Sequence, residues 1–269
     1  MADRQRIAIG LEYDGRGFEG WQTQPHGRTV QDALERALGR IADTERVATV
    51  CAGRTDTGVH ATVQVAHFDA PVARPDQAWV RGVNSHLPEG VAVLWARPVD
   101  EGFHARFRAQ SRIYRYLLLN RPVRPGLLAG RVGWHHLPLD VEAMAQAAQG
   151  LVGTHDFSAF RAAACQARSP VREMRRVALS RRGDLIVFEF EANAFLHHMI
   201  RNLVGALVYV GKGAWTAGRL ASVLAARDRS QAAPTFSPDG LYLCGVDYSD
   251  AWLLPERGRI ISRPLFAGE

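Results

Sequence analysis

The sequence predicts an α+β protein whose two halves run through one order of elements: strand, helix, strand, strand, helix, strand. The chain has 269 residues, near the length at which a single hydrophobic core divides in two. Hydrophobic residues make up 47% and charged residues 22%, which is typical of globular proteins and excludes a disordered chain. The spacing of apolar residues switches along the chain between the periods of strands and of helices. We expect the halves to be residues 1–104 and 105–269.

The first half opens with an alternating strand pattern that ends at the turn sequence Asp14-Gly15. Apolar residues at steps of three and four then predict a helix that Thr29 caps. Two stretches rich in β-branched residues flank the segment 54–58, which has the composition of a turn. The predicted elements are strands at 6–13, 47–52, 59–69 and 91–98, and helices at 29–41 and 75–87.

The second half follows the same order, although no repeat of the residues themselves supports it. The predicted elements are strands at 113–120, 176–179, 185–191 and 241–248, and helices at 140–152, 197–210 and 217–226. Two split βαβ units are therefore predicted from the order of elements alone.

The charge favours an anionic partner. The formal net charge is +6, and Lys212 is the single lysine among 33 basic residues. The planar guanidinium group of arginine is suited to binding phosphates and stacking on bases. A GC-rich codon bias would produce the same excess of arginine over lysine. No carboxylate lies between Glu101 and Asp140, and we call residues 102–139 the arginine stretch. Its arginines are Arg106, Arg108, Arg112, Arg115, Arg121, Arg124 and Arg131, and its interleaved aromatic residues include Phe103, Phe107, Tyr114, Tyr116 and Trp134.

Two interpretations of the arginine stretch stay open, a nucleic-acid contact and a solvated charged face. The aromatic side chains favour the first, because they offer stacking platforms for bases. A second arginine-rich cluster follows, made of Arg161, Arg168, Arg172, Arg175, Arg176, Arg181 and Arg182.

Cysteine and histidine spacing predicts neither disulfides nor a metal site. Cys51, Cys165 and Cys244 are odd in number and far apart. The pairs His135-His136 and His197-His198 lack the spacing of metal ligands, and core or helix-cap roles fit them better. No apolar run approaches the roughly 20 residues of a membrane span, and the first residues alternate instead of forming a signal peptide. We expect a cytoplasmic protein without metal.

Arg54-Thr55-Asp56 is the strongest candidate for chemistry. In an extended chain residues two apart share one face, so Arg54 would lower the pKa of Asp56 and keep it ionised as a nucleophile or base. The alternative is a structural ion pair at a β-turn. Asp56-Thr57-Gly58 also matches the triplet of aspartic proteases, but the single copy argues against a hydrolase.

Residues 51–60, Cys-Ala-Gly-Arg-Thr-Asp-Thr-Gly-Val-His, closely resemble the catalytic motif of the tRNA pseudouridine synthase A family. One departure is Thr57, where the family usually has Ala. Further segments agree with that family's signatures in order along nearly the whole chain. They are Gly20-Trp21-Gln22, Thr29-Val30-Gln31, Phe103 to Phe107, Tyr114-Arg115-Tyr116, His155-Asp156-Phe157, Phe195 to Asn202 and Gly240 to Leu243.

The resemblance implies a pseudouridine synthase fold, with two ferredoxin-like βαββαβ halves that form a central basic cleft. It also implies a homodimer that uses no cofactor or metal. The implied reaction converts uridine to pseudouridine at positions 38, 39 or 40 in the anticodon stem-loop of tRNA. A non-catalytic RNA-binding chaperone is the competing hypothesis, and the intact Arg54-Thr55-Asp56 favours the enzyme.

The resemblance also implies roles for individual residues. Asp56 becomes the nucleophile, which adds to C6 of uracil or acts at C1′ of the ribose. Arg54 holds its charge and fills part of the space that a flipped base vacates. Tyr114 packs on the uracil, or is an ordinary strand aromatic, and Leu241 forms an apolar wall of the pocket, or is core. The remaining substrate contacts are Arg201, as a phosphate partner, an Asp56 partner or a surface ion pair, and Arg106 in the arginine stretch.

Overall fold

A computed structural model describes residues 5–255 of the chain. These residues form two compact units, one made of 5–110 with 242–255 and one made of 111–241. The division differs from the predicted halves 1–104 and 105–269, because the last strand of the chain pairs with a strand of the first unit. Strands dominate both units and helices pack on them, so the predicted α+β class is confirmed.

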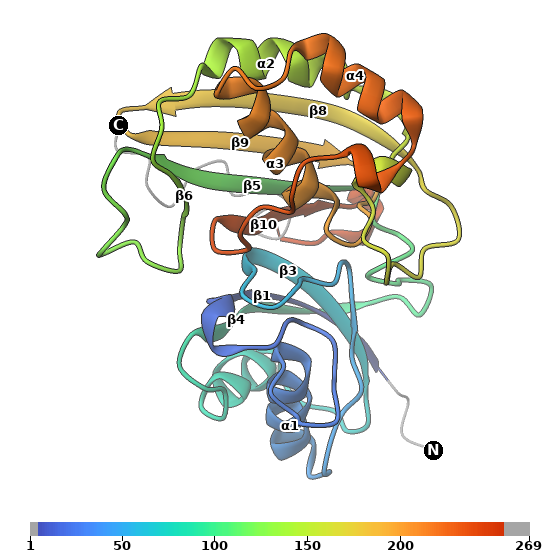
Figure 1. The fold of residues 1–269 in the computed structure, drawn as a ribbon. Helices are drawn as coiled ribbons and strands as arrows, with labels where there is room; N and C mark the ends of the chain where they lie inside the picture. Colours follow the sequence, from blue (N-terminus) through green and yellow to red (C-terminus); the bar gives the residue numbers. More distant parts are fainter. Residues whose placement is uncertain (1–4, 256–269) are drawn as a thin grey trace. The chain divides into compact units, whose positions relative to one another are not determined.

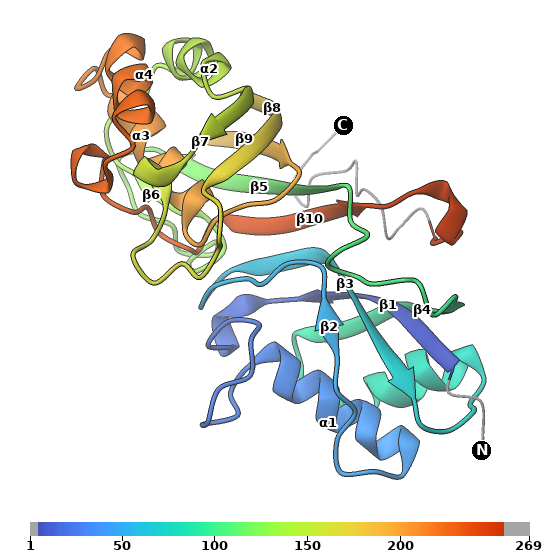
Figure 2. The ribbon, with the colours of Figure 1, turned by 90° about the vertical axis from the view of Figure 1, so that its right-hand side faces the viewer.

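The first unit is a mostly antiparallel sheet with helices on one side (Figures 1 and 2). Its strands are β1 (Gln5–Tyr13), β2 (Val50–Cys51), β3 (His60–Ala70), β4 (Val91–Val99) and β10 (Leu241–Asp247). The order is β4-β1-β3-β10, and β2 also pairs with β3. β10 runs parallel to β3 at His60 and Ala61, whereas β2 pairs with its far end at Ala66 and His67. The two strands therefore share one edge of β3.

The helices of the first unit are α1 (Val30–Ala42) and a helical segment, 76–84, around the π-helical turn η2 (Ala78–Gly82). Thr29 caps α1 as predicted, because its side chain accepts a hydrogen bond from the backbone N–H of Asp32. The predicted strand 47–52 is shortened to β2. Thr49 donates its backbone N–H and its hydroxyl to Glu35 of α1, which leaves only two residues for the sheet.

The second unit has its helices on one face of its sheet (Figures 1 and 2). The strand order is β5-β9-β8-β7, with β6 parallel to β5, and α2 contacts β8, α3 and α4. The strands are β5 (Ser111–Asn120), β6 (Gly133–His135), β7 (Gly153–Asp156), β8 (Val171–Arg182) and β9 (Leu185–Ala192). The helices are α2 (Val141–Gln149), α3 (Met199–Gly211) and α4 (Ala217–Ala226). β6 and β7 are absent from the prediction because three or four residues carry no readable period.

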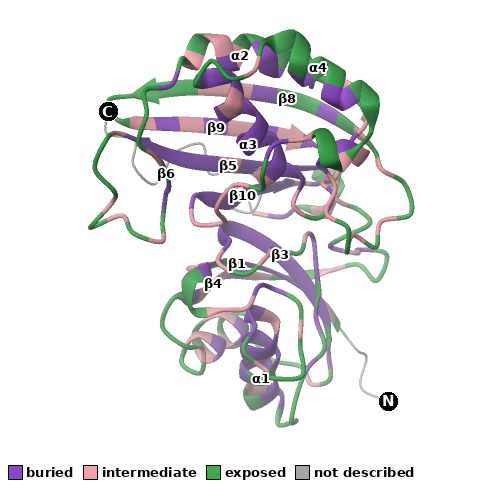
Figure 3. Ribbon diagram, viewed as in Figure 1, coloured by how far each residue is buried: buried purple, intermediate pink, exposed green. Residues whose placement is uncertain are grey.

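Each unit has its own core. Figure 3 shows β3 and α3 buried along most of their length, and their side chains agree with this. Short 3₁₀ turns connect the larger elements: η1 (Gly15–Gly17), η3 (Ser158–Phe160), η4 (Arg229–Gln231) and η5 (Asp250–Trp252). Within residues 5–255 none of the helices combines the length and the hydrophobicity that crossing a membrane requires.

Candidate active site

Asp56 lies on the loop 52–58, which follows β2 and leads into β3. It opens a β-turn in which the backbone N–H of Val59 donates to the carbonyl oxygen of Asp56 at 3.1 Å. Gly58 has φ 77°, a conformation that glycine adopts without steric penalty. Thr57, the departure from the family pattern, is exposed within this turn. The Thr57 side chain is therefore accommodated at the surface of the turn.

The backbone of this loop is fixed from three directions. The hydroxyls of Thr55 and Tyr13 lie 2.8 Å apart in the core, and the backbone N–H of Trp21 donates to the carbonyl of Thr55 at 3.0 Å. The amide nitrogen of Gln64 donates to the carbonyl of Gly53 at 2.6 Å. These contacts therefore fix the backbone directly before Asp56.

Gly20 allows the segment before α1 to come close to the backbone of Thr55. Its φ is 83°, and a Cβ at this position would lie 2.8 Å from the carbonyl oxygen of Thr55. The α1 helix holds the same segment, since Val30 and Gln31 donate their backbone N–H groups to the carbonyls of Gly20 and Trp21. The Gly20-Trp21 and Thr29-Val30-Gln31 signatures therefore support the Asp56 loop.

The start of β3 has its own support from the turn that follows β1. The backbone N–H of Gly15 donates to Nδ1 of His60 at 3.0 Å, and Asp14 lies 3.3 Å from the same nitrogen. The His60 ring stacks on Tyr242 of β10 with 4.6 Å between ring centroids. A hydrogen bond from Arg16 holds the pKa of Asp14 well below its ordinary value. β10 thus stabilises the residues directly after the Asp56 loop.

Arg54, Asp56 and Arg106 are the predicted site residues of the first unit. Arg54 is exposed, Thr55 is buried and Asp56 is half-buried, so successive side chains alternate as in an extended chain. The expected ion pair of Arg54 with Asp56 stays a prediction. Burial raises the pKa of the Cys51 thiol to about 12, and both Arg54 and Arg106 act on it in the opposite direction. Both arginines therefore lie near the end of β2.

Tyr114, Arg201 and Leu241 are the predicted site residues of the second unit. Tyr114 lies on β5 with its ring edge-on to Phe195, at 5.1 Å between centroids. Arg201 lies on α3 and donates from Nε to the carbonyl of Phe236 at 2.9 Å. The backbone N–H of Leu241 donates to Pro238 at 2.8 Å.

The segment 236–241 joins these elements. The Tyr116 hydroxyl donates to the carbonyl of Ser237 at 2.9 Å, and the backbone N–H of Leu117 donates to Gly240 at 2.8 Å. Burial holds the pKa of Tyr116 far above its ordinary value, and the nearby Arg201 acts against this. The predicted wall residue Leu241 is thus the last residue of a segment that is fixed between β5 and α3.

Some arginines of the arginine stretch form contacts within the protein, and others have exposed side chains. Arg112 is buried and donates to the carbonyl of Asn193 at 2.7 Å, and Arg115 pairs with Glu189 at 2.8 Å. The guanidinium groups of Arg112 and Arg115 therefore bind the protein itself. The exposed arginines of the stretch are Arg106, Arg108, Arg124 and Arg131, and Arg121 is half-buried.

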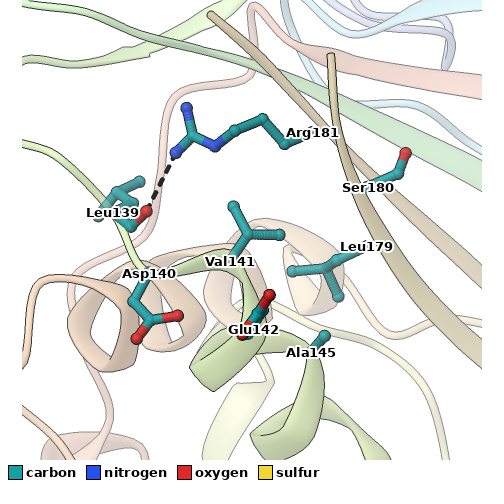
Figure 4. Close-up of a pocket in the computed structure, with 8 residues that line it drawn as sticks. All are labelled: Leu139, Asp140, Val141, Glu142, Ala145, Leu179, Ser180 and Arg181. Carbon is teal, nitrogen blue, oxygen red and sulfur yellow. Dashed lines mark hydrogen bonds between the residues drawn. The ribbon is translucent and has the colours of Figure 1, made fainter. Parts of the chain in front are cut away.

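A cavity of about 500 Å³ lies in the second unit between α2 and β8 (Figure 4). Arg181 crosses its rim and donates to the carbonyl of Leu139 at 3.0 Å. The lining residues are Leu139, Asp140, Val141, Glu142, Ala145, Leu179, Ser180 and Arg181. They include none of the predicted site residues, so this cavity is not part of the candidate active site.

Sequence reasoning missed the residues that hold the Asp56 loop in place. Tyr13 and Gln64 lie on β1 and β3, where their positions read as ordinary strand residues. Gln64 is wholly buried and Tyr13 is 4% exposed, so their polar groups lie in the core. The hydrogen bond between the Tyr13 and Thr55 hydroxyls spans 42 residues of sequence, and no local pattern predicts such a contact.

Comparisons with known proteins give one consistent result. The family model described as tRNA pseudouridine synthase matches residues 10–108 and 147–249. A tRNA pseudouridine synthase A of Aromatoleum aromaticum is 65% identical over 96% of this chain and 98% of its own. Those of Dechloromonas aromatica and Chromobacterium violaceum are 64% and 61% identical, over 93% and 94% of this chain and 95% and 96% of their own.

A solved structure, titled as a crystal structure of a Cbf5-Nop10-Gar1 complex, is also similar at 12% identity, over 88% of this chain and 48% of that chain. The TM-score of this match is 0.38.

Proposed function

The chain belongs to the tRNA pseudouridine synthase family, and we propose that Asp56 is the nucleophile in a uridine isomerisation. The family supports tRNA as the substrate. We place the reaction in the anticodon stem-loop, at positions 38, 39 or 40. The observation that carries the proposal is the loop 52–58, whose backbone is fixed at Gly53 and Thr55 directly before Asp56.

The reaction explains why a fixed carboxylate is needed. The N1–C1′ bond must break, and the base must rotate while it is held. C5 must then bond to C1′ and lose its proton, and N1 must take up a proton. A carboxylate can add to C6 of uracil, or it can act at C1′ of the ribose. Both routes need an ionised oxygen whose position is set before the base arrives, because orientation lowers the barrier of such steps.

The other site residues have supporting roles in this proposal. Arg54 and Arg106, near the end of β2, contact phosphates of the RNA. Arg54 also fills part of the space that the flipped base leaves in the RNA. Tyr114 packs on the uracil, Leu241 provides an apolar wall, and Arg201 contacts a phosphate.

We further propose that the enzyme is a cytoplasmic homodimer that needs neither metal nor cofactor and that binds tRNA in a basic cleft. The exposed arginines of the arginine stretch support the RNA contact. Light scattering of the purified protein tests the homodimer, and a monomeric mass at micromolar concentration would refute it.

The central test is product mapping on unmodified tRNA. We expect carbodiimide treatment followed by primer extension to reveal pseudouridine at one or more of positions 38, 39 and 40. Pseudouridine only at other positions would refute the proposed specificity. RNA binding without pseudouridine would favour the chaperone hypothesis instead.

A further inference from the structure

The segment after β4 presents an exposed aromatic ring in a fixed position. Phe107 is 75% exposed, whereas Phe103 and Tyr116 of the same arginine stretch are wholly buried. Trp134 is 38% exposed, and its indole N–H donates to the carbonyl of Arg121. Phe107 is thus the most accessible aromatic ring of the arginine stretch.

The backbone of residues 103–105, directly before Phe107, is anchored to other parts of the first unit. The backbone N–H of Ala105 donates to Nδ1 of His67 at 3.1 Å, and the Tyr248 hydroxyl donates to the carbonyl of Ala105 at 2.6 Å. Arg6 donates to the carbonyl of Phe103 at 3.0 Å. The buried Phe103 ring packs against Tyr248, 5.3 Å between centroids. The position of Phe107 is therefore set by the core.

His104 orients the Phe107 ring. The two rings stack with 4.3 Å between centroids and 27° between planes. Nδ1 of His104 accepts the backbone N–H groups of Arg106 and Phe107, each at 3.2 Å. Burial, with help from the nearby Arg6, lowers the pKa of His104, so the imidazole is neutral at pH 7 and Nδ1 stays an acceptor. One face of Phe107 is thus covered by a ring that is itself fixed.

The charges around this ring fit an RNA strand. The Arg106 guanidinium lies 5.7 Å from the centre of the Phe107 ring. Arg106 and Arg108, the neighbours of Phe107 in sequence, are both exposed. An isolated exposed apolar side chain is ordinary in proteins. An aromatic ring that is stacked, anchored and flanked by arginines matches the platforms on which proteins hold unpaired bases.

We propose that Phe107 is a stacking platform for an unpaired nucleobase of the RNA substrate, with Arg106 on the adjoining phosphate. The proposal rests on the RNA substrate of the proposed function and adds a site separate from Asp56. Phe107 acts in binding and takes no part in the chemistry at the target uridine. His104 is a positioning residue, because it acts through Phe107.

The test compares Kd for unmodified tRNA with Kd for a blunt-ended RNA duplex. Phe107→Leu keeps an apolar side chain but removes the ring, and we expect tRNA binding to weaken by about 5- to 100-fold. Duplex binding should not change, because paired bases are not available for stacking. Phe107→Trp should restore tRNA affinity. The matched control is Leu127→Ala, which removes an apolar side chain that is 93% exposed in the same stretch and should leave both Kd values unchanged.

Salt titration distinguishes the contribution of the Phe107 ring to tRNA binding from that of Arg106. Phe107→Leu should keep the slope of log K against log salt, whereas Arg106→Gln should reduce it by about one unit. With unmodified tRNA as substrate, Phe107→Leu should raise KM and leave kcat near the parental value.

Equal tRNA affinity of Phe107→Leu and the parent would overturn the proposal. An equal loss on tRNA and duplex would overturn it as well, since the ring would then not contact an unpaired base. Pseudouridine formation by the parent is measured on the same preparation, so failure of the proposed function is seen separately from failure of the platform.

Discussion

The Asp56 loop and the arginine stretch differ in how firmly the fold holds their functional side chains. The loop 52–58 is anchored by side chains and backbone groups of β1, β3 and the segment before α1. The arginine stretch keeps Arg112 and Arg115 for internal contacts and exposes Arg108 and Arg124. Chemistry needs a fixed atom, whereas attraction to a phosphate tolerates a mobile charge. We therefore expect loop variants to change turnover and stretch variants to change affinity.

The largest effect is expected for Asp56→Asn. The amide is nearly isosteric with the carboxylate but cannot act as an anionic nucleophile, so kcat should fall by about 1000-fold or more. Binding of tRNA and thermal stability should stay near parental values. Pseudouridine formation is measured by primer extension, in a preparation free of host enzyme and of deamidated protein. Product at more than a trace of the parental rate would exclude Asp56 as the nucleophile.

Gly20→Ala tests the support of the loop. The new Cβ would lie 2.8 Å from the carbonyl of Thr55, and φ 83° is strained for alanine. Moving the loop should lower kcat by about 10- to 100-fold while tRNA binding is retained. Gly17→Ala is the matched control, because a Cβ there meets nothing within 4 Å. If both variants turned over at the parental rate, the loop would not need its anchors.

Tyr114→Ala should reduce turnover by about 5- to 100-fold, since base stacking contributes roughly 1–3 kcal/mol. The salt dependence of tRNA binding should not change, because a ring contacts no phosphate. Single-turnover kinetics beside a salt titration measure both quantities. A reduced salt slope with parental turnover would place Tyr114 among the affinity residues instead.

Arg108→Ala and Arg124→Ala should each lower the slope of log K against log salt by about one unit and weaken all tRNAs alike. Arg112→Ala should instead lower the free energy of unfolding by about 1–3 kcal/mol, because it leaves the carbonyl of Asn193 without this hydrogen bond. Thermal denaturation separates the two outcomes. Parental salt slopes for both exposed arginines would show that they form a solvated face.

Removal of divalent metal should have the smallest effect. The spacing of histidine, cysteine and carboxylate residues in the sequence predicts no metal site, so EDTA should leave turnover unchanged. The assay must confirm that the tRNA stays folded without magnesium. A loss of activity that added zinc restores would contradict this prediction.

The sequence predicted those elements whose cause is local. The strand 6–13 and the helices at 29–41 and 217–226 were found within a few residues, because periodicity and caps such as Thr29 lie in the chain itself. The predicted strand 47–52 was longer than β2, because the backbone N–H of Thr49 donates a hydrogen bond to Glu35 instead of joining the sheet. Glu35 lies 14 residues away in the sequence. The pairing of β10 with β3 could not be predicted, because the residues of a strand do not show which other strand it will pair with.

The candidate site divides in the same way. Asp56 stands in a motif that sequence comparison finds directly, and the turn that it opens was predicted from Gly58. The ion pair of Arg54 with Asp56 was expected from spacing alone and stays a prediction. Tyr13 and Gln64 were missed because they act through hydrogen bonds to Thr55 and Gly53, which are distant from them in the sequence.

The first unit takes strands from both ends of the chain, and this has a consequence for synthesis on the ribosome. Residues 5–110 emerge first, but the edge of β3 at His60 and Ala61 receives β10 only after the whole of 111–241 has been made. That edge directly follows the Asp56 loop, and Tyr242 supplies the ring on which His60 stacks. The support that β10 gives to the residues after the Asp56 loop can therefore form only once residues 111–241 have been synthesised.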